Sequence, residues 1–212
     1  MKGNSSETDH LLSLARDGDR RVLNDLFSRH SERLLHTIKL RIDRRLSGRI
    51  DPGDVLQEVY LEALKRFGGY VQDPPAPFFL WLRQIAFDKL VDVHRFHLKA
   101  KARDPRREVA LAHRTLREAE SSVLVLELAG KRSTPSRAAM ATEAKARLQE
   151  AFGRLSPLDR KVLVLRHIER LTTPELAHEL EMEISAVRKR QARALVKLKA
   201  ILAAMPGGLE AL

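Results

Sequence analysis

The chain has 212 residues, enough for one large domain or two small ones. Its 39 lysines and arginines outnumber its 28 aspartates and glutamates, and the formal charge of +11 favours a polyanionic partner such as nucleic acid. The absence of cysteine excludes disulfides and thiolate metal sites, and no apolar run is long enough for a signal peptide or a membrane span. We therefore expect a cytoplasmic protein that does not insert into a membrane.

Apolar residues recur three and four positions apart from the first segments onward, as at Val22, Leu23, Leu26 and Phe27. This spacing places their side chains on one face of a helix. No segment shows the sustained alternation of a strand or the turn signal of a hairpin. The pattern therefore predicts an all-α protein.

Two segments interrupt the helical pattern. Residues 68–78 contain three prolines and two glycines, which predicts an ordered loop between helices. Residues 129–143 are small and polar with one proline, which is typical of a flexible linker. We therefore expect two small helical domains, at residues 1–103 and 144–212, joined by a connector and linker at residues 104–143.

A helix is predicted over residues 51–67, with Asp51 as its cap and Pro52 in its first turn. Its outer face is acidic and partly apolar, and such a patch suits a basic protein partner better than DNA. The alternative is an ordinary solvated face whose acids favour the positive end of the helix dipole. The outer-face residues are Asp54, Gln57, Glu58, Leu61 and Glu62.

Residues 78–104 predict a longer helix that combines aromatic and basic side chains. Aromatic residues such as Phe78, Phe79 and Trp81 lie among cations, a combination that suits single-stranded nucleic acid. The alternative is that most of these rings, Trp81 included, belong to the core. The cations expected on the exposed side of this helix include Arg83, Lys89, Arg95 and Lys99.

Two histidines of this segment are weak candidates for metal ligands. His94 and His97 lie three residues apart, near Asp92, but zinc needs three or four ligands and no second cluster accompanies them. The sequence also lacks a Gly-rich phosphate loop, a nucleophile elbow and paired catalytic carboxylates. We therefore expect no metal, no cofactor, no catalytic residue and no enzymatic activity.

The C-terminal part predicts a helix-turn-helix supported by an upstream helix over residues 155–172, capped by Ser156. Thr172 and Glu175 form a capping box, a turn is expected at residues 181–183, and the second helix begins near Ile184. This second helix carries cations without acids, and in a helix-turn-helix its first turns would face base edges. The alternative is a basic surface helix that does not recognise DNA. The candidate DNA-contacting residues are Arg188, Lys189, Arg190, Gln191 and Arg193.

These segments, in this order, resemble a bacterial sigma-70 family sigma factor of the extracytoplasmic-function (ECF) type, over about residues 9–103 and 144–203. DPGDVLQEVYLEAL resembles the core-binding helix, which implies that Asp54, Gln57 and Glu58 contact the clamp helices of the RNA polymerase β′ subunit. FFLWLRQIAFDKLVDVHR resembles the promoter-melting helix, preceded by the loop that captures a flipped base of the minus-ten element. The helix-turn-helix resembles the domain that reads the minus-thirty-five element.

The resemblance implies that core RNA polymerase, duplex promoter DNA and the melted strand are partners, with an anti-sigma factor as a further candidate. Three positions depart from the family pattern: Arg170 and Glu181 replace glycines that permit positive φ, and Asp88 replaces a frequent asparagine. Two alternatives remain open. One is a helix-turn-helix regulator that does not bind polymerase core, and the other is an enzyme acting on nucleic acid.

Overall fold

The computed structural model describes residues 8, 10–13, 15, 20–42, 48–98 and 146–205. All the regular secondary structure in these ranges is helical, which confirms the predicted all-α fold. The described helices fall into two units, one before residue 99 and one after residue 145. The predicted connector and linker, residues 104–143, lie outside the described residues, so the exact domain boundaries stay a prediction.

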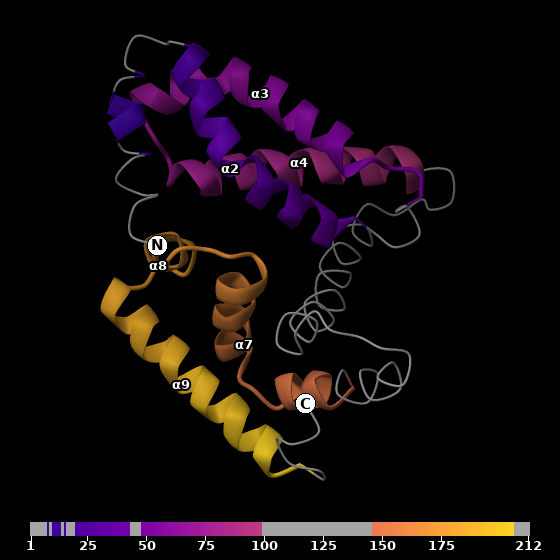
Figure 1. Ribbon diagram of the computed structural model, residues 1–212, viewed down its shortest axis with the longest axis vertical. Helices are drawn as coiled ribbons and strands as arrows, with labels where there is room; N and C mark the ends of the chain where they lie inside the picture. Colours follow the sequence, from indigo (N-terminus) through magenta and orange to yellow (C-terminus); the bar gives the residue numbers. More distant parts are fainter. Residues whose placement is uncertain are drawn as a thin grey trace. The chain divides into compact units, whose positions relative to one another are not determined.

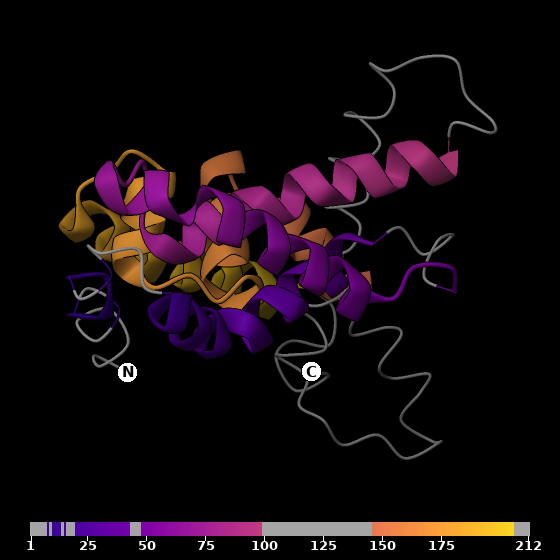
Figure 2. The ribbon, with the colours of Figure 1, turned by 90° about the horizontal axis from the view of Figure 1, so that it is seen from above.

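The N-terminal unit is built from three helices that each pack against the other two, α2 (Arg20–Arg41), α3 (Pro52–Gln72) and α4 (Phe78–Leu98). They lie side by side in both ribbon views (Figure 1, Figure 2). As predicted, α3 begins at Asp51, whose carboxylate accepts a hydrogen bond of 2.7 Å from the backbone N–H of Gly53. The fully buried core side chains include Leu23, Leu26, Leu34, Ile38, Val59, Ala63, Leu82 and Ile85.

Helix α3 continues four residues beyond Gly68, where the sequence predicted that a loop had already begun. The loop is therefore shorter than expected and spans residues 73–77. The helix continues because Tyr70 is buried against Phe78 and Trp81, with ring centroids 5.5 and 4.5 Å away. Burial of a large aromatic side chain outweighs the cost of about 1 kcal/mol for each helical glycine.

Replacing Gly68 and Gly69 by alanine is expected to stabilise this unit by about 1 kcal/mol per site, because alanine is the better helix former. Both glycines are exposed, and an added Cβ would meet no atom within 4 Å. Gly53→Ala is the matched control, since its Cβ would lie 3.2 Å from the capping carboxylate oxygen of Asp51. Thermal unfolding checks the prediction, and a lower melting temperature for Gly68→Ala or Gly69→Ala would contradict it.

The C-terminal unit contains a helical segment at residues 146–153, then α7 (Pro157–Leu163), α8 (Thr173–Glu179) and α9 (Ile184–Ala203). Helix α9 packs against both α7 and α8. The predicted capping box is present, since Thr172 Oγ1 accepts from the Glu175 N–H and the Glu175 carboxylate accepts from the Thr172 N–H. Helix α9 begins at Ile184, as the sequence predicted, and completes the helix-turn-helix.

The supporting helix upstream of this pair differs from the regular helix that the sequence predicted. After α7 the chain forms a π-helical segment, η2 (Val164–Ile168), and then leaves the helix at Glu169. Arg170 and Glu181 both adopt the left-handed conformation, with φ of 57° and 51°. The two turns therefore keep a backbone shape that favours glycine although neither residue is one, at a cost of about 1–2 kcal/mol per site.

Candidate protein and nucleic-acid interfaces

The four residues predicted to bind polymerase lie on one face of α3, because they are spaced three and four residues apart. We call Asp54, Gln57, Glu58 and Leu61 the core-contact face. All four are exposed, and the Leu61 side chain, 56% accessible, is a large apolar group among carboxylates. An exposed leucine beside acids is suited to a protein partner that offers both cations and apolar contact.

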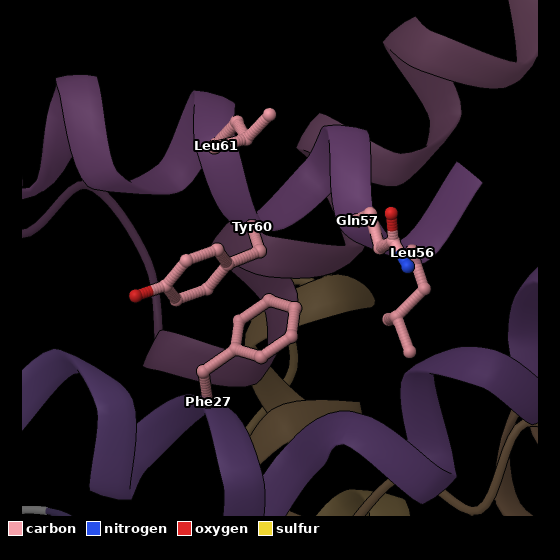
Figure 3. Close-up of a pocket in the computed structure, with 5 residues that line it drawn as sticks. All are labelled: Phe27, Leu56, Gln57, Tyr60 and Leu61. Carbon is pink, nitrogen blue, oxygen red and sulfur yellow. The ribbon is translucent and has the colours of Figure 1, made fainter. Parts of the chain in front are cut away.

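A hollow of about 350 Å³ borders the core-contact face between α2 and α3. It is lined by Phe27, Leu56, Gln57, Tyr60 and Leu61, and Figure 3 shows the rings of Phe27 and Tyr60 next to each other. These rings meet edge to face at 5.0 Å, and the Tyr60 hydroxyl donates to the side-chain oxygen of Asn24. Sequence reasoning missed the hollow, because periodicity assigned Phe27, Leu56 and Tyr60 to the core.

Glu62 was predicted on the outer face of α3, but cations of the protein already surround it. Arg66 binds its carboxylate at 2.7 Å, and Lys65 and Lys89 lie 3.6 and 3.7 Å from it. The hydrogen bond from Arg66 lowers the pKa of the Glu62 carboxyl. Lys89, predicted to bind DNA, is thus half-buried and tied to α3.

The prediction that α4 exposes a basic side was wrong for Arg83. Its side chain is only 7% accessible, and its guanidinium lies 4.7 Å from the centre of the Phe87 ring, where α4 faces α2. Arg95 is exposed as expected, whereas Lys99 lies outside the described residues. Among the described residues, the exposed side of α4 carries Gln84, Asp88, Val91, Asp92 and Arg95, so it is less basic than expected.

The loop before α4 is held from both ends. The Tyr70 hydroxyl donates to the Ala76 carbonyl at 3.0 Å, and the backbone N–H of Trp81 donates to the Pro77 carbonyl at 3.1 Å. Phe78 and Phe79 are buried, which places both rings in the core, while Trp81 is half-buried beside Tyr70. Of the three aromatic residues that open α4, Trp81 alone is partly exposed.

Helix α9 presents a wide basic surface. We define its outward face as Ser185, Arg188, Lys189, Ala192, Arg193, Val196 and Lys199, all of which are exposed. The buried face comprises Val187, Ala194, Leu198 and Leu202, whereas Leu195 is 38% exposed. Three of the five predicted DNA-contacting residues therefore lie outward, and sequence reasoning missed Ser185, Ala192 and Val196.

Arg190 and Gln191, the other two predicted contacts, are half-buried. Arg190 Nη1 lies 2.9 Å from Asp159 Oδ1, and Lys197 Nζ lies 2.9 Å from Asp159 Oδ2. Hydrogen bonds from Lys197, Ser156 and Arg190 hold the pKa of the Asp159 carboxyl below its ordinary value, although burial alone would raise it. The structure thus gives Arg190 a partner within the protein, while its contact with DNA stays a prediction.

Two further expectations concern metals and membranes. In the described ranges, no group of three or more His, Asp or Glu residues could hold a metal ion, and the side chain of His97 lies outside those ranges. Within the same part of the chain, every helix is too short or too polar to cross a bilayer.

Comparisons with known proteins bear on both units. Residues 145–198 match the family model of sigma-70 region 4. The chain is 28% identical over 202 residues to RNA polymerase sigma factor CnrH of Cupriavidus metallidurans, which covers 94% of this chain and 96% of the relative. It is 28% identical over 191 residues to the ECF RNA polymerase sigma factor SigD of Mycobacterium tuberculosis, with 90% and 82% covered.

Two further proteins are similar to the chain. RNA polymerase sigma-H factor of Pseudomonas aeruginosa is 24% identical over 189 residues, with 89% of this chain and 90% of the relative covered. A solved structure of CnrH in complex with the cytosolic domain of CnrY is 25% identical, covers 92% of this chain and 96% of that chain, and has a TM-score of 0.44. The relatives span almost the whole chain, and the family model falls on the unit that contains the helix-turn-helix. Over almost its whole length the chain is similar to RNA polymerase sigma factors, and its C-terminal unit matches region 4 of the sigma-70 family.

Proposed function

We propose that this sigma factor binds core RNA polymerase through the core-contact face of α3 and reads the minus-thirty-five promoter element with the outward face of α9. The observation that carries the proposal is the opposite charge of two exposed helix faces. The core-contact face presents two carboxylates around Leu61, whereas α9 contains no acid and exposes Arg188, Lys189, Arg193 and Lys199. Each face suits a different partner, one a basic protein surface and the other DNA.

The partner of the core-contact face is proposed to be the clamp helices of the β′ subunit. Asp54 and Glu58 would pair with cations there, while Leu61 would supply apolar contact area. A regulator that never binds polymerase would leave this exposed leucine beside acids without an assigned partner. Transcription from candidate promoters with core polymerase and the purified chain tests the function, and failure to support initiation on any of them would reject it.

An anti-sigma factor is a further proposed partner. The hollow of Phe27, Leu56, Gln57, Tyr60 and Leu61 adjoins the core-contact face, and two of its residues belong to that face. An inhibitor that inserts an apolar side chain there would cover Gln57 and Leu61 and exclude polymerase. This proposal predicts that inhibitor and core compete for one surface.

On α9, direct DNA contacts are assigned to the predicted residues that lie outward, Arg188, Lys189 and Arg193. Arg188 is in the second turn of the helix, where a helix-turn-helix places side chains at base edges. Gln191 is half-buried and Arg190 is paired with Asp159 at the flank of the helix, so we assign neither residue a direct contact with DNA.

Arg188→Ala is expected to cost about 1–3 kcal/mol in promoter binding and to relax specificity at one base pair, because an arginine that reads a base distinguishes it from the other three. Lys199→Ala is the control, since this residue lies three turns further along and would meet phosphates. Its loss should weaken all sequences equally and flatten the salt dependence. The measurement is transcription from promoters with single-base changes, and an unchanged preference in Arg188→Ala would remove the assigned role.

The N-terminal unit is also proposed to stabilise the melted strand at the minus-ten element. The held loop at residues 73–77 would receive one extruded base, and the half-buried Trp81 would offer the accessible part of its ring for stacking. Arg95, with Lys89 and Lys99, would attract the phosphates of that strand. Asp88 and Asp92 share the exposed side of α4, so the loop and Trp81 are expected to matter more than the charge of the helix.

A further inference from the structure

Asp159 joins the supporting helix α7 to the recognition helix α9. Its side chain is only 2% accessible, and each carboxylate oxygen meets one cation of α9 at 2.9 Å, Arg190 on Oδ1 and Lys197 on Oδ2. Arg190 and Lys197 are seven residues apart, so they lie on the same side of α9, two turns from each other. One buried anion therefore holds two points of the recognition helix.

Asp159 depends on these ion pairs more than Arg190 and Lys197 do. A buried carboxylate without partners is costly, so Asp159 needs its cations. The cations need Asp159 less, because the side chains of Arg190 and Lys197 are 37% and 59% accessible and can reach water or another anion. Without Asp159, both would become available to phosphates.

We infer that Asp159 is a positioning residue that withholds Arg190 and Lys197 from DNA and so confines the DNA-binding charge of α9 to its outward face. This inference rests on the proposed DNA-reading function, and it adds that two cations of α9 are kept from DNA. Cations that reach phosphates strengthen binding to every sequence, whereas only base contacts distinguish one sequence from another. Withholding two flanking cations therefore lowers non-specific binding and leaves specific contacts intact.

The test compares the full-length parent and Asp159→Asn in binding to a random-sequence duplex over a range of salt concentrations. Asparagine keeps the shape of the side chain but removes the charge, so it releases one or both cations. Each released cation that pairs with a phosphate steepens the slope of log affinity against log salt by about 0.9. Between 200 and 50 mM salt, the affinity of the variant relative to the parent should therefore rise about threefold for one such cation and about tenfold for two.

Lys197→Ala, introduced into the parent and into Asp159→Asn, distinguishes the withholding of cations by Asp159 from a purely structural role. In the parent, Lys197 is held by Asp159, so its removal should leave the slope unchanged. In Asp159→Asn, Lys197 is free to bind phosphate, so its removal should lower the slope by about 0.9. Loss of packing alone would weaken binding without this dependence on background.

Two results would overturn the inference. The first is a flatter slope for Lys197→Ala in the parent, which would mean that Lys197 already binds phosphate; this arm does not require Asp159→Asn to fold. The second is an Asp159→Asn variant that keeps the melting temperature and the slope of the parent. A parent that binds no duplex at all would instead reject the DNA-reading function, so the two failures are distinguishable.

Discussion

Asp54→Lys combined with Glu58→Lys is expected to lower the affinity for core RNA polymerase by roughly thirtyfold or more. Both carboxylates are exposed on the core-contact face, so their reversal places like charges against a basic partner. Such juxtaposition costs about 2 kcal/mol or more across an interface, which corresponds to that loss. The measurement is a binding titration of labelled chain with purified core polymerase.

The fold should survive this change, because neither side chain is buried or engaged in the core. Lysine near the N-terminus of α3 opposes the helix dipole, so a small loss of about 0.3–1 kcal/mol is expected and can be checked by thermal unfolding. The control reverses two other exposed acids of the same unit, Glu32 and Asp73, and produces the same change of net charge. Equal loss of affinity in both double variants would show that net charge, and not the core-contact face, determines binding.

The parts of the molecule that local sequence determines were predicted well. Asp51 with Pro52, and Thr172 with Glu175, mark helix starts through contacts within four residues, and both starts were confirmed. Periodicity likewise placed Asp54, Gln57, Glu58 and Leu61 on one face, because helical spacing alone determines which side chains share a side. The start of α9 followed from the end of the preceding amphipathic pattern.

The features that were missed depend on contacts between distant residues. Helix α3 continues past two glycines because Tyr70 packs on Phe78 and Trp81 of the next helix. Local helix propensity does not encode that contact. Arg190 lies 31 residues from Asp159 in sequence, so composition suggested a free cation where the structure has an ion pair. Arg83 was predicted to be exposed for the same reason, although the folded chain buries it.

The left-handed turns show how a sequence departure can be misleading. Arg170 and Glu181 occupy positions where the family pattern has glycine, a residue that permits positive φ. Both residues nevertheless adopt positive φ. At Glu181 the turn is closed by backbone hydrogen bonds from Glu181 N–H to His178 and from Met182 N–H to Ala177. The packing of α8 on α9 therefore imposes the turn on a residue that disfavours it.

Replacing residues 73–77 by a Gly/Ser segment of equal length is expected to reduce open-complex formation on duplex promoter by about tenfold or more. The prolines at 74, 75 and 77 and the hydrogen bond from Tyr70 to Ala76 hold the loop before DNA arrives, so a flexible loop would lose additional conformational entropy on binding a base. A loss of about 1.4 kcal/mol, the equivalent of immobilising the backbone of about one residue, corresponds to tenfold. Open complexes are measured by permanganate reactivity of unpaired thymines.

A promoter with a pre-melted bubble distinguishes base capture from damage to the fold. Unpairing costs a few kcal/mol on the duplex and nothing in the bubble, so the loop variant should recover much of its activity there. Trp81→Ala provides the second arm, because loss of one stacking contact costs about 1–3 kcal/mol on any template where a base is held, including the bubble. The loop variant should therefore be rescued by the bubble more completely than Trp81→Ala. Equal activity of parent and loop variant on duplex promoter would mean that residues 73–77 only connect two helices.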